Sequence, residues 1–424
     1  MTLATDEPIL SVDFGTSNSA ACWVEGGEIT VIPLEADRPT IPSAIFFSGE
    51  DLSVIYGSEA IRRYEAGMDG RLMKALKTVL SSALIDESTA IRGGYIQYRR
   101  VLELFLQHIK DKAEQKMGGT VSQALLGRPV HFLDDNPERD RKAERTLAEI
   151  AAAIGLASVE FQYEPIAAAI DYEVQLEDDR IVLVVDIGGG TSDFSLINLG
   201  PGYRNDADRV NSVIGTAGVR IAGTDFDKYV NLATTMQTMG MDAIGRSGRR
   251  LPDYLYRTLS TWHEINTAYN ADDISATKQL RSEFADLQMH DRLMTTLLEK
   301  LGHRIIGSAE RAKVAAAEGD SVDIDLGFVE EALVVPLGAD ILLESVEQSV
   351  SKILECAEDL VQRSEVARED ISALYFTGGS SGLKCLREAF RESFPASEAR
   401  VGEQFTSVSQ GLSLAALRGY WVRH

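Results

Sequence analysis

A glycine-rich hairpin signal in the middle of the chain constrains the fold more than any other feature. Residues 181–196 read IVLVVDIGGGTSDFSL, an uncharged apolar run, three glycines, and a second run in which apolar residues alternate with serines. The β-branched content and the alternation predict two strands joined by a turn. Gly188, Gly189 and Gly190 remove three successive Cβ atoms, so backbone N–H groups can approach a bulky, electron-rich group. Polyphosphate is the natural candidate.

The same pattern occurs near the N-terminus. Residues 9–21 read ILSVDFGTSNSAA, which is a strand, Asp13, a Gly-Thr-Ser turn and a second strand of small residues. The interval between Asp13 and Asp186 is far longer than the roughly 50 residues of the longest solenoid repeats. We therefore expect a duplicated half-chain, with two hairpins that hold phosphate from opposite sides.

Composition excludes several classes of protein. The chain has 424 residues, of which 44% are hydrophobic, so it can bury an ample core in two to four structural units. A net charge of −23 argues against a nucleic-acid partner. The N-terminus is acidic and no apolar run reaches membrane-spanning length, so we expect no membrane partner. Three separated cysteines, Cys22, Cys356 and Cys385, predict a reducing, cytoplasmic location.

Several catalytic motifs are absent from the sequence. It contains no GxxxxGK[ST], no GxGxxG after a strand and no HExxH, which argues against a P-loop, a dinucleotide fold and a zinc hydrolase. Residues 378–382 formally match the nucleophile elbow GxSxG, but an esterase needs an acid and then a histidine downstream, and only His424 follows. We instead expect 378–382 to form a strand-to-helix anion site or a close-packed turn.

The remaining chain predicts alternating strands and helices. Residues 58–117 look helical, and the segment after Leu133 has Asn136 as N-cap of a helix that stops at Gly155. Further expected elements are a strand at 159–163, a helix from Glu164-Pro165, strand near 210–215, helices over 231–317 with a loop at 241–252, a helix from Leu342, a strand at 373–376 and a closing helix at 407–417.

Five motifs in this order carry a family resemblance. They are VDFGTSNS from Val12, EPIAAA from Glu164, VDIGGGTSD from Val185, GTDFD from Gly223 and GGS from Gly378. Together they resemble the ATPase domain of the seventy-kilodalton heat-shock chaperones, in the actin and sugar-kinase superfamily, and most of all its short, YegD-like members. The resemblance implies an α/β, actin-like ATPase fold with two lobes, duplicated mixed sheets and helical inserts around a nucleotide cleft. It also implies ATP or ADP and Mg²⁺ as cofactors, with K⁺ as a further candidate ion.

The resemblance assigns roles to the phosphate side of the site. Asp13 and Asp186 would hold magnesium through its waters and orient the attacking water, although both could simply cap strand ends. Lys77 would stabilise the transferred phosphoryl group, with Lys74 one turn away as the alternative. Glu164 would link the lobes near the reacting water, or merely start a helix. The expected phosphate ligands are Gly15, Thr16, Ser17, Gly188, Gly189, Gly190 and Thr191.

The adenosine side departs from the family pattern. The residues at matching positions are Gly223, Glu310, Lys313, Gly378, Gly379 and Ser380. Where the family usually has two arginines that stack on adenine, this chain has Val314 and Gly382. The loss of two guanidinium planes should weaken adenine binding or alter its selectivity.

The expected organisation is lobe I at 1–179, with an insert at about 50–117 and the helix 405–424 returning to it, and lobe II at 180–404, with an insert at about 231–301. The chain stops at Tyr420–His424, soon after the closing helix, so we expect no peptide-binding domain. The leading interpretation is a slow ATPase that acts as a nucleotide switch, with co-chaperone or client proteins as candidate partners. A small-molecule kinase and a non-catalytic actin-like scaffold remain alternatives.

Overall fold

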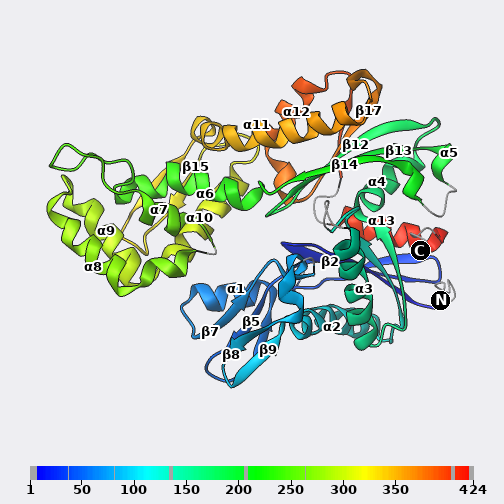
Figure 1. The fold of residues 1–424 in the computed structure, drawn as a ribbon, viewed down its shortest axis with the longest axis horizontal. Coiled ribbons are helices and arrows are strands. Elements are labelled where there is room, and N and C mark those ends of the chain that lie inside the picture. The colour runs from blue at the N-terminus through cyan, green and yellow to red at the C-terminus, as the bar shows by residue number, and fades with distance from the viewer. Residues whose placement is uncertain are drawn as a thin grey trace. The chain divides into compact units, whose positions relative to one another are not determined.

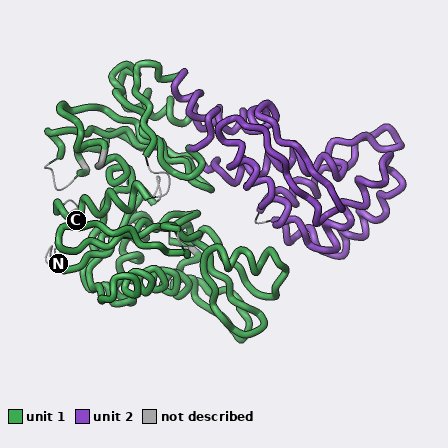
Figure 2. The backbone as a smooth tube through the Cα atoms, turned by 180° about the vertical axis from the view of Figure 1, so that it is seen from behind, with its two compact units in different colours: residues 1–219, 356–381, 393–424 green, residues 220–355, 382–392 purple. Residues whose placement is uncertain are grey.

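The chain folds into two compact units. The computed structural model describes residues 7–36, 38–80, 82–132, 137–204, 209–262, 264–402 and 406–419. Leu133, Asn136 and Tyr420–His424, named above, lie outside the described residues. The first unit contains Met1–Val219, Cys356–Ser381 and Ser393–His424, and the second contains Arg220–Glu355 and Gly382–Glu392 (Figure 2). The predicted lobes 1–179 and 180–404 divide the chain elsewhere and stay a prediction.

Two mixed sheets form the centre of the first unit (Figure 1). The strands of the first sheet, in spatial order, are β11 (Ser158–Tyr163), β10 (Gln123–Arg128), β1 (Ile9–Phe14), β2 (Asn18–Glu25) and β3 (Glu28–Val31), and β4 (Thr40–Pro42) also pairs with β2. The strands of the second sheet are β14 (Val213–Val219), β13 (Ser192–Leu199), β12 (Arg180–Ile187), β17 (Ile371–Thr377) and β18 (Glu398–Val401).

The two sheets repeat one topology. In each, a central strand forms an antiparallel hairpin with the next strand and pairs in parallel with a later one: β1 with β2 and β10, β12 with β13 and β17. The outer strands also correspond. At one edge, β11 is parallel to β10 and β18 is parallel to β17. At the other edge, β3 is antiparallel to β2 and β14 is antiparallel to β13. The predicted hairpins and the mixed α/β fold with duplicated sheets are therefore confirmed.

Two helices fill the layer between these sheets. They are α4 (Glu164–Val174) and α13 (Ser407–Arg418), which share one buried apolar cluster with residues of both sheets (Figure 1). The helices approach so closely that a Cβ on Gly411 would collide with the Ala167 carbonyl. The outer face of the first sheet packs with α2 (Tyr98–Met117) and α3 (Pro137–Ala153) around a second cluster. The predicted alanine-rich helix and closing helix are thus central to the core.

The expectation of a helical stretch at 58–117 is wrong in part. Helices α1 (Gly57–Glu65) and α2 flank a three-stranded sheet, β6 (Val54–Tyr56), β5 (Ile45–Ser48) and β7 (Gly70–Met73), and a hairpin of β8 (Ser88–Ile91) and β9 (Gly94–Gln97). The hairpin turns at Gly93 and Gly94, whose φ values of +88° and +152° suit glycine. The strands β7, β8 and β9 are short and mostly exposed, so they lack the apolar alternation that identifies a half-buried strand.

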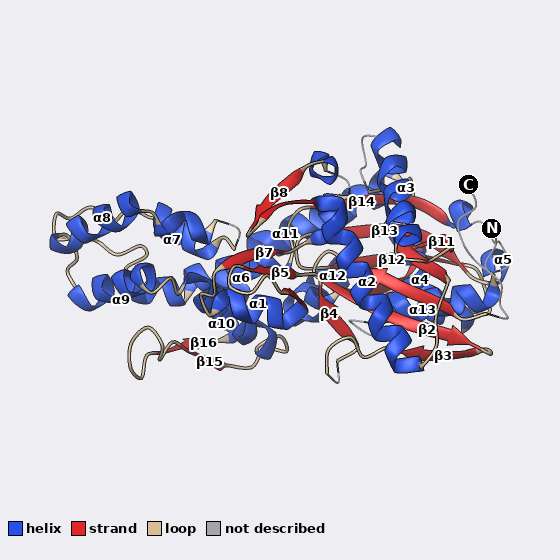
Figure 3. Ribbon diagram, turned by 90° about the horizontal axis from the view of Figure 1, so that it is seen from below, coloured by secondary structure: helices blue, strands red, loops and turns tan. Residues whose placement is uncertain are grey.

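The second unit is largely helical, as predicted. Figure 3 shows α7 (Tyr254–Ser260), α8 (Ala271–Gln279) and α9 (Leu287–Leu298) as helices joined by turns and loops. The unit also contains α6 (Gly223–Ala233), α10 (Gly302–Ala315), the hairpin of β15 (Val322–Asp325) and β16 (Val334–Leu337), the first part of α11 (Ala339–Arg363) and most of α12 (Lys384–Ser393). The predicted apolar face of α11 is buried from Leu342 to Leu360.

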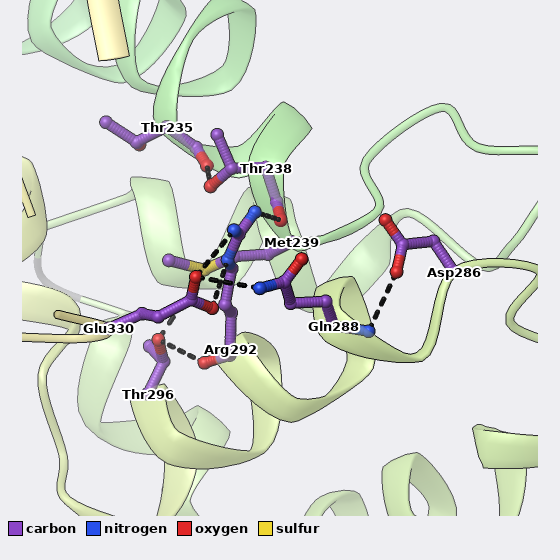
Figure 4. Close-up of polar contacts among 8 residues, drawn as sticks. All are labelled: Thr235, Thr238, Met239, Asp286, Gln288, Arg292, Thr296 and Glu330. Atoms are coloured by element: carbon purple, nitrogen blue, oxygen red, sulfur yellow. Dashed lines mark hydrogen bonds and ion pairs between the residues drawn. The ribbon is translucent and has the colours of Figure 1, made fainter. Parts of the chain in front are cut away.

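Ion pairing attaches the β15–β16 loop to the helices of the second unit. Arg292 on α9 donates to both carboxylate oxygens of Glu330, at 2.7 and 2.9 Å, and to the Thr238 carbonyl (Figure 4). Gln288 donates to the same carboxylate at 3.0 Å. Two-point Arg–carboxylate pairing of this kind holds both side chains in one geometry.

Candidate functional site

Asp13 and Asp186 occupy equivalent places in the two sheets. Asp13 lies on β1 just before the first loop, Gly15–Ser17, and Asp186 lies on β12 just before the second loop, 188–191. Side chains alternate along a strand, so Asp13 shares a face with Ile9, and Asp186 shares a face with Val184. Ile9 and Val184 belong to the cluster around α4 and α13. Both carboxylates therefore project into the layer where α4 begins at Glu164.

The two loops lie in contact. A Cβ built on Gly189 would collide with the Ser17 hydroxyl, so the second loop approaches the first through a residue that must be small. In the first loop, a Cβ on Gly15 would collide with the Asn18 carbonyl, so glycine is also required there. The structure thus brings together the two loops that the sequence repeat predicts.

Four carboxylates and one lysine gather beside the loops. Burial and the negative charges of Glu164 and Asp186 raise the pKa of Asp13 to about 8, against the lowering effect of Lys77. Burial and the charges of Asp193 and Glu164 raise the pKa of Asp186 to about 7. Like charges at short range disfavour the ionised form of each carboxyl group. The cluster therefore has more carboxyl groups than its one lysine can balance, so a cationic partner would favour their ionised forms.

Lys77, not Lys74, is placed at this cluster. Its Nζ donates to Glu164 Oε1 at 2.5 Å, and both side chains are mostly buried, at 12% and 13% exposed. Burial alone would lower the pKa of Lys77, but the charges of Glu164 and Asp13 outweigh it and raise the pKa. Lys77 lies in a 3₁₀ turn, Leu76–Val79, that follows Ala75 with a φ of +54°. Lys74 is exposed to solvent.

The loop glycines leave space that packing does not require. A Cβ on Gly190 would meet nothing within 4 Å, and one on Gly188 would meet only the Thr191 carbonyl at 3.5 Å. Neither residue has the left-handed φ that favours glycine. Among the described residues, the N–H groups of Thr16, Gly189 and Gly190 have no protein acceptor. Open space lined by unsatisfied donors fits a polyphosphate.

The same residues fit a hydrated magnesium ion. Magnesium prefers oxygen ligands and usually keeps several waters, so one or two carboxylates suffice to hold it. Asp13 and Asp186 supply such carboxylates, and burial, together with neighbouring carboxylates, raises the pKa of both. Within the described residues, no group of three or more His, Cys, Asp or Glu side chains is arranged as a metal site. Two carboxylates are enough for a magnesium ion that keeps most of its waters.

Asp193 is a site residue that the sequence reasoning missed. The hairpin register places it directly opposite Asp186 on β13, and it accepts a hydrogen bond from the Thr191 hydroxyl at 2.8 Å. Because the turn joins β12 and β13 in a tight hairpin, the acid that ends the GGGTSD motif is the cross-strand neighbour of the acid before it. That pairing is the signal that could have identified Asp193.

The turn after β17 lies against the second loop. Gly378 has a φ of +81°, and a Cβ there would collide with the Asp186 carboxylate. Gly379 begins a 3₁₀ turn, Gly379–Gly382, in which Ser380 donates its hydroxyl to the Gly188 carbonyl at 2.8 Å. The structure therefore brings 378–380, expected on the adenosine side, to the phosphate loop.

The other adenosine-side residues lie in the second unit. Lys313 is buried, forms an ion pair with Asp227 at 2.7 Å and donates to the Gly223 carbonyl at 3.2 Å. Glu310 is exposed on the same helix, α10. Because these residues and the loops belong to different units, a shared adenosine pocket stays a prediction.

The two positions at which this chain lacks the expected adenine-stacking arginines, Val314 and Gly382, have different environments. Val314, in place of the first expected arginine, is 64% exposed on α10. Gly382, in place of the second, accepts a hydrogen bond through its carbonyl from Arg387 at 2.6 Å, and Arg387 also pairs with Glu318 at 2.8 Å. A guanidinium is therefore held beside Gly382, although it comes from α12 rather than from the turn.

Comparison with known families adds an independent finding. Residues 76–243 match the family model described as Hsp70 protein. The matched segment contains Lys77, Glu164, the second loop and Gly223. Members of this family are ATPases that use ATP or ADP with Mg²⁺, and they act as molecular chaperones. In the part of the chain that the structure describes, no helix is long and apolar enough to cross a membrane. Residues 76–243 are thus similar to the Hsp70 family, and the mixed α/β fold with two duplicated sheets is consistent with an actin-like ATPase fold.

Proposed function

We propose that this protein binds Mg-ATP, hydrolyses it slowly to ADP and phosphate, and uses the nucleotide as a conformational switch. The observation that carries the proposal is the meeting of two glycine loops, with unsatisfied N–H donors, beside four carboxylates and one buried lysine. Backbone donors suit phosphate oxygens, and the excess carboxylates suit the cation that accompanies polyphosphate.

Each side chain has a role that follows from its position. Asp13 and Asp186 would hold a magnesium ion through its waters, and the ion would neutralise phosphate charge. Asp186, which lies on β12 just before the second loop, is the carboxylate proposed to orient the attacking water. Lys77, oriented by Glu164, places a fixed positive charge where negative charge develops. The Thr191 hydroxyl donates a hydrogen bond to Asp193, which fixes this side chain at the second loop, where we propose that it contacts phosphate.

The chemical step balances with water as the only co-substrate. Water oxygen forms a bond to the γ-phosphorus, the bond from that phosphorus to the bridging oxygen of ADP breaks, and the water proton passes to a carboxylate. No acceptor hydroxyl is required, which distinguishes this reaction from that of a small-molecule kinase. A cytoplasmic location and co-chaperone or client partners are further parts of the proposal, which rest on the cysteine pattern and on the family.

Thermal unfolding with and without nucleotide tests the proposal. At about 100 times its dissociation constant, Mg-ATP should stabilise the native wild-type protein by about 2.7 kcal/mol. The Asp186→Asn variant should keep part of this stabilisation and lose hydrolysis. Phosphate release without any acceptor supports an ATPase. Binding without phosphate release favours a scaffold, and the absence of any nucleotide-induced shift in wild type overturns the proposal.

A further inference from the structure

Two buried serines hold equivalent carbonyl groups in the two phosphate loops. Ser43 donates its hydroxyl to the Gly15 carbonyl at 2.7 Å, and Ser380 donates its hydroxyl to the Gly188 carbonyl at 2.8 Å. Gly15 and Gly188 are the first glycines of their loops, each two residues after the site aspartate. Ser43 is 1% exposed and Ser380 is 9% exposed. Both hydroxyls are therefore committed to the loops.

Each serine is itself firmly placed. The Ser43 N–H donates to the Ser17 carbonyl at 2.8 Å, and its hydroxyl also lies 2.9 Å from that of Ser19, so the first loop is held at two points. Ser380 lies in the 3₁₀ turn that follows β17, and β17 pairs in parallel with β12. The positions of both hydroxyls are thus set by the sheets rather than by flexible surface segments.

The duplication of the fold does not account for this match. Ser43 follows β4, which pairs with β2, the second strand of the first hairpin. Ser380 follows β17, which pairs with β12, the first strand of the second hairpin. Two topologically different segments therefore make the same hydrogen bond, which points to a shared requirement at the loops.

The requirement is a fixed direction for the N–H group that follows each carbonyl. A trans peptide is planar, so the carbonyl of Gly15 and the N–H of Thr16 point in opposite directions within one plane. The same holds for the carbonyl of Gly188 and the N–H of Gly189. A serine that holds the carbonyl therefore turns the next N–H to the opposite side of the loop. These two N–H groups have no acceptor among the described residues of the protein.

We propose that Ser43 and Ser380 are matched positioning residues, which orient the N–H groups of Thr16 and Gly189 toward the phosphate chain of the nucleotide. This inference rests on the proposed function, because it requires a phosphate ligand at the loops. It moves the Ser380 hydroxyl from the adenosine side to the phosphate side. The side chain does not touch the nucleotide and acts through the peptide that it holds.

Binding of Mg-ADP and of adenosine, measured by calorimetry, separates the two roles. Ser43→Ala and Ser380→Ala should each raise the dissociation constant for Mg-ADP by about three- to tenfold, as expected for loss of one hydrogen bond. Their dissociation constants for adenosine, which has no phosphate, should equal that of wild type. The double variant should bind Mg-ADP more weakly than either single variant.

Matched variants control for damage to the fold. Ser381 is the buried neighbour of Ser380, and its hydroxyl donates to the Gly378 carbonyl at 2.7 Å instead of to a phosphate loop. Ser381→Ala should cost similar thermal stability but leave Mg-ADP binding unchanged. Ser380→Thr retains a hydroxyl and should restore Mg-ADP binding.

Two results would overturn the inference. One is Mg-ADP affinity in both alanine variants equal to that of wild type. The other is a loss for adenosine as large as the loss for Mg-ADP, which returns Ser380 to the adenosine side. Failure of the wild-type protein to bind Mg-ADP at all would instead contradict the proposed function, so the two failures are distinguishable.

Discussion

At the scale of single residues, the charge balance around Lys77 dominates the site. One ammonium group faces Glu164 at 2.5 Å and also interacts with Asp13 and Asp193. Partly buried ion pairs of this kind give little net stability, because desolvation offsets the attraction. Removal of one partner, however, leaves uncompensated charge. Loss of the lysine should therefore affect the fold as well as the proposed chemistry, so its role is tested against a matched control.

A pair of lysine variants tests this assignment. Lys77→Ala should lower the rate of ATP hydrolysis by about 100-fold, as does removal of other charge-stabilising groups from active sites. Lys74→Ala, the matched control one turn away, should leave the rate close to that of wild type. Phosphate release at saturating Mg-ATP measures both. Equal losses in the two variants would contradict the placement of Lys77.

Asp13 should make the stability of the nucleotide-free protein depend on pH. Its pKa rises from an ordinary 3.8 to about 8 on folding, so between these values the folded protein holds a proton that the unfolded chain has released. Folding therefore takes up a proton, and this uptake becomes less favourable as pH rises. The free energy of unfolding thus falls as pH rises across this window.

Asp13→Asn should therefore stabilise the protein at pH 8, without nucleotide or magnesium, because the unfolded wild-type chain is ionised at this position while burial disfavours ionisation in the folded protein. At pH 4 the difference should be much smaller, because the folded wild-type protein is uncharged at this position and the unfolded chain is only partly ionised. Urea unfolding from pH 4 to 8 measures the effect, and magnesium should reduce it at pH 8. Parallel pH profiles for variant and wild type would show that the carboxyl group of Asp13 is not destabilised by folding.

At the scale of elements, the local sequence pattern predicts the helices and strands that bury a regular set of apolar residues. Both hairpins, α4, α11 and α13 follow the expected ranges closely, because buried runs, a Pro-initiated helix and a regular apolar face are all visible in sequence. The strands β7, β8 and β9 were missed because each is short and largely exposed. These strands form because β7 pairs with β5 and β8 pairs with β9. The apolar pattern within a single short segment does not reveal such pairing.

The residues of the candidate site also fall into two groups, those visible in the sequence pattern and those found only in the structure. Sequence reasoning identified the loop glycines and the two aspartates because they repeat. It left open the choice between Lys74 and Lys77, which depends on the left-handed turn at Ala75. It missed Asp193 and Ser43, because cross-strand register and a contact 28 residues away bring them to the loops. Motif spacing therefore identifies the candidate ligand-binding groups, and tertiary structure identifies the side chains that contact them.

The second loop allows ligand binding to be separated from folding. Because a Cβ on Gly190 meets nothing within 4 Å and its φ is not left-handed, Gly190→Ala should change the melting temperature of the nucleotide-free protein little. The same methyl group would occupy the space proposed for phosphate, so Mg-ADP affinity should fall by about tenfold or more. Gly119→Ala, where the nearest atom is Trp23 Cζ2 at 4.0 Å, is the control. A variant that binds Mg-ADP normally would place the phosphates elsewhere.

At the scale of the whole molecule, the expected nucleotide contacts are divided between two units. The first unit holds both loops, Lys77, Glu164 and the turn 378–380. The second holds Gly223, Glu310 and Lys313, of which Lys313 is already paired with Asp227. A ligand can shift a conformational equilibrium only through differential interactions with its states, so the proposed switch predicts that adenosine affects residues of the second unit.

Amide hydrogen exchange can show whether the nucleotide engages both units. Mg-pyrophosphate should protect residues 15–17, 76–79 and 188–191, all in the first unit, because it offers only phosphate oxygens. Mg-ADP should protect these residues and also 223–227 and 310–314 in the second unit, because adenosine adds contacts there. The loop around Glu330, held by Arg292, serves as an internal reference that neither ligand should affect. Identical protection by the two ligands would mean that adenosine makes no use of the second unit, and that the chain lacks the link between its units that a nucleotide switch needs.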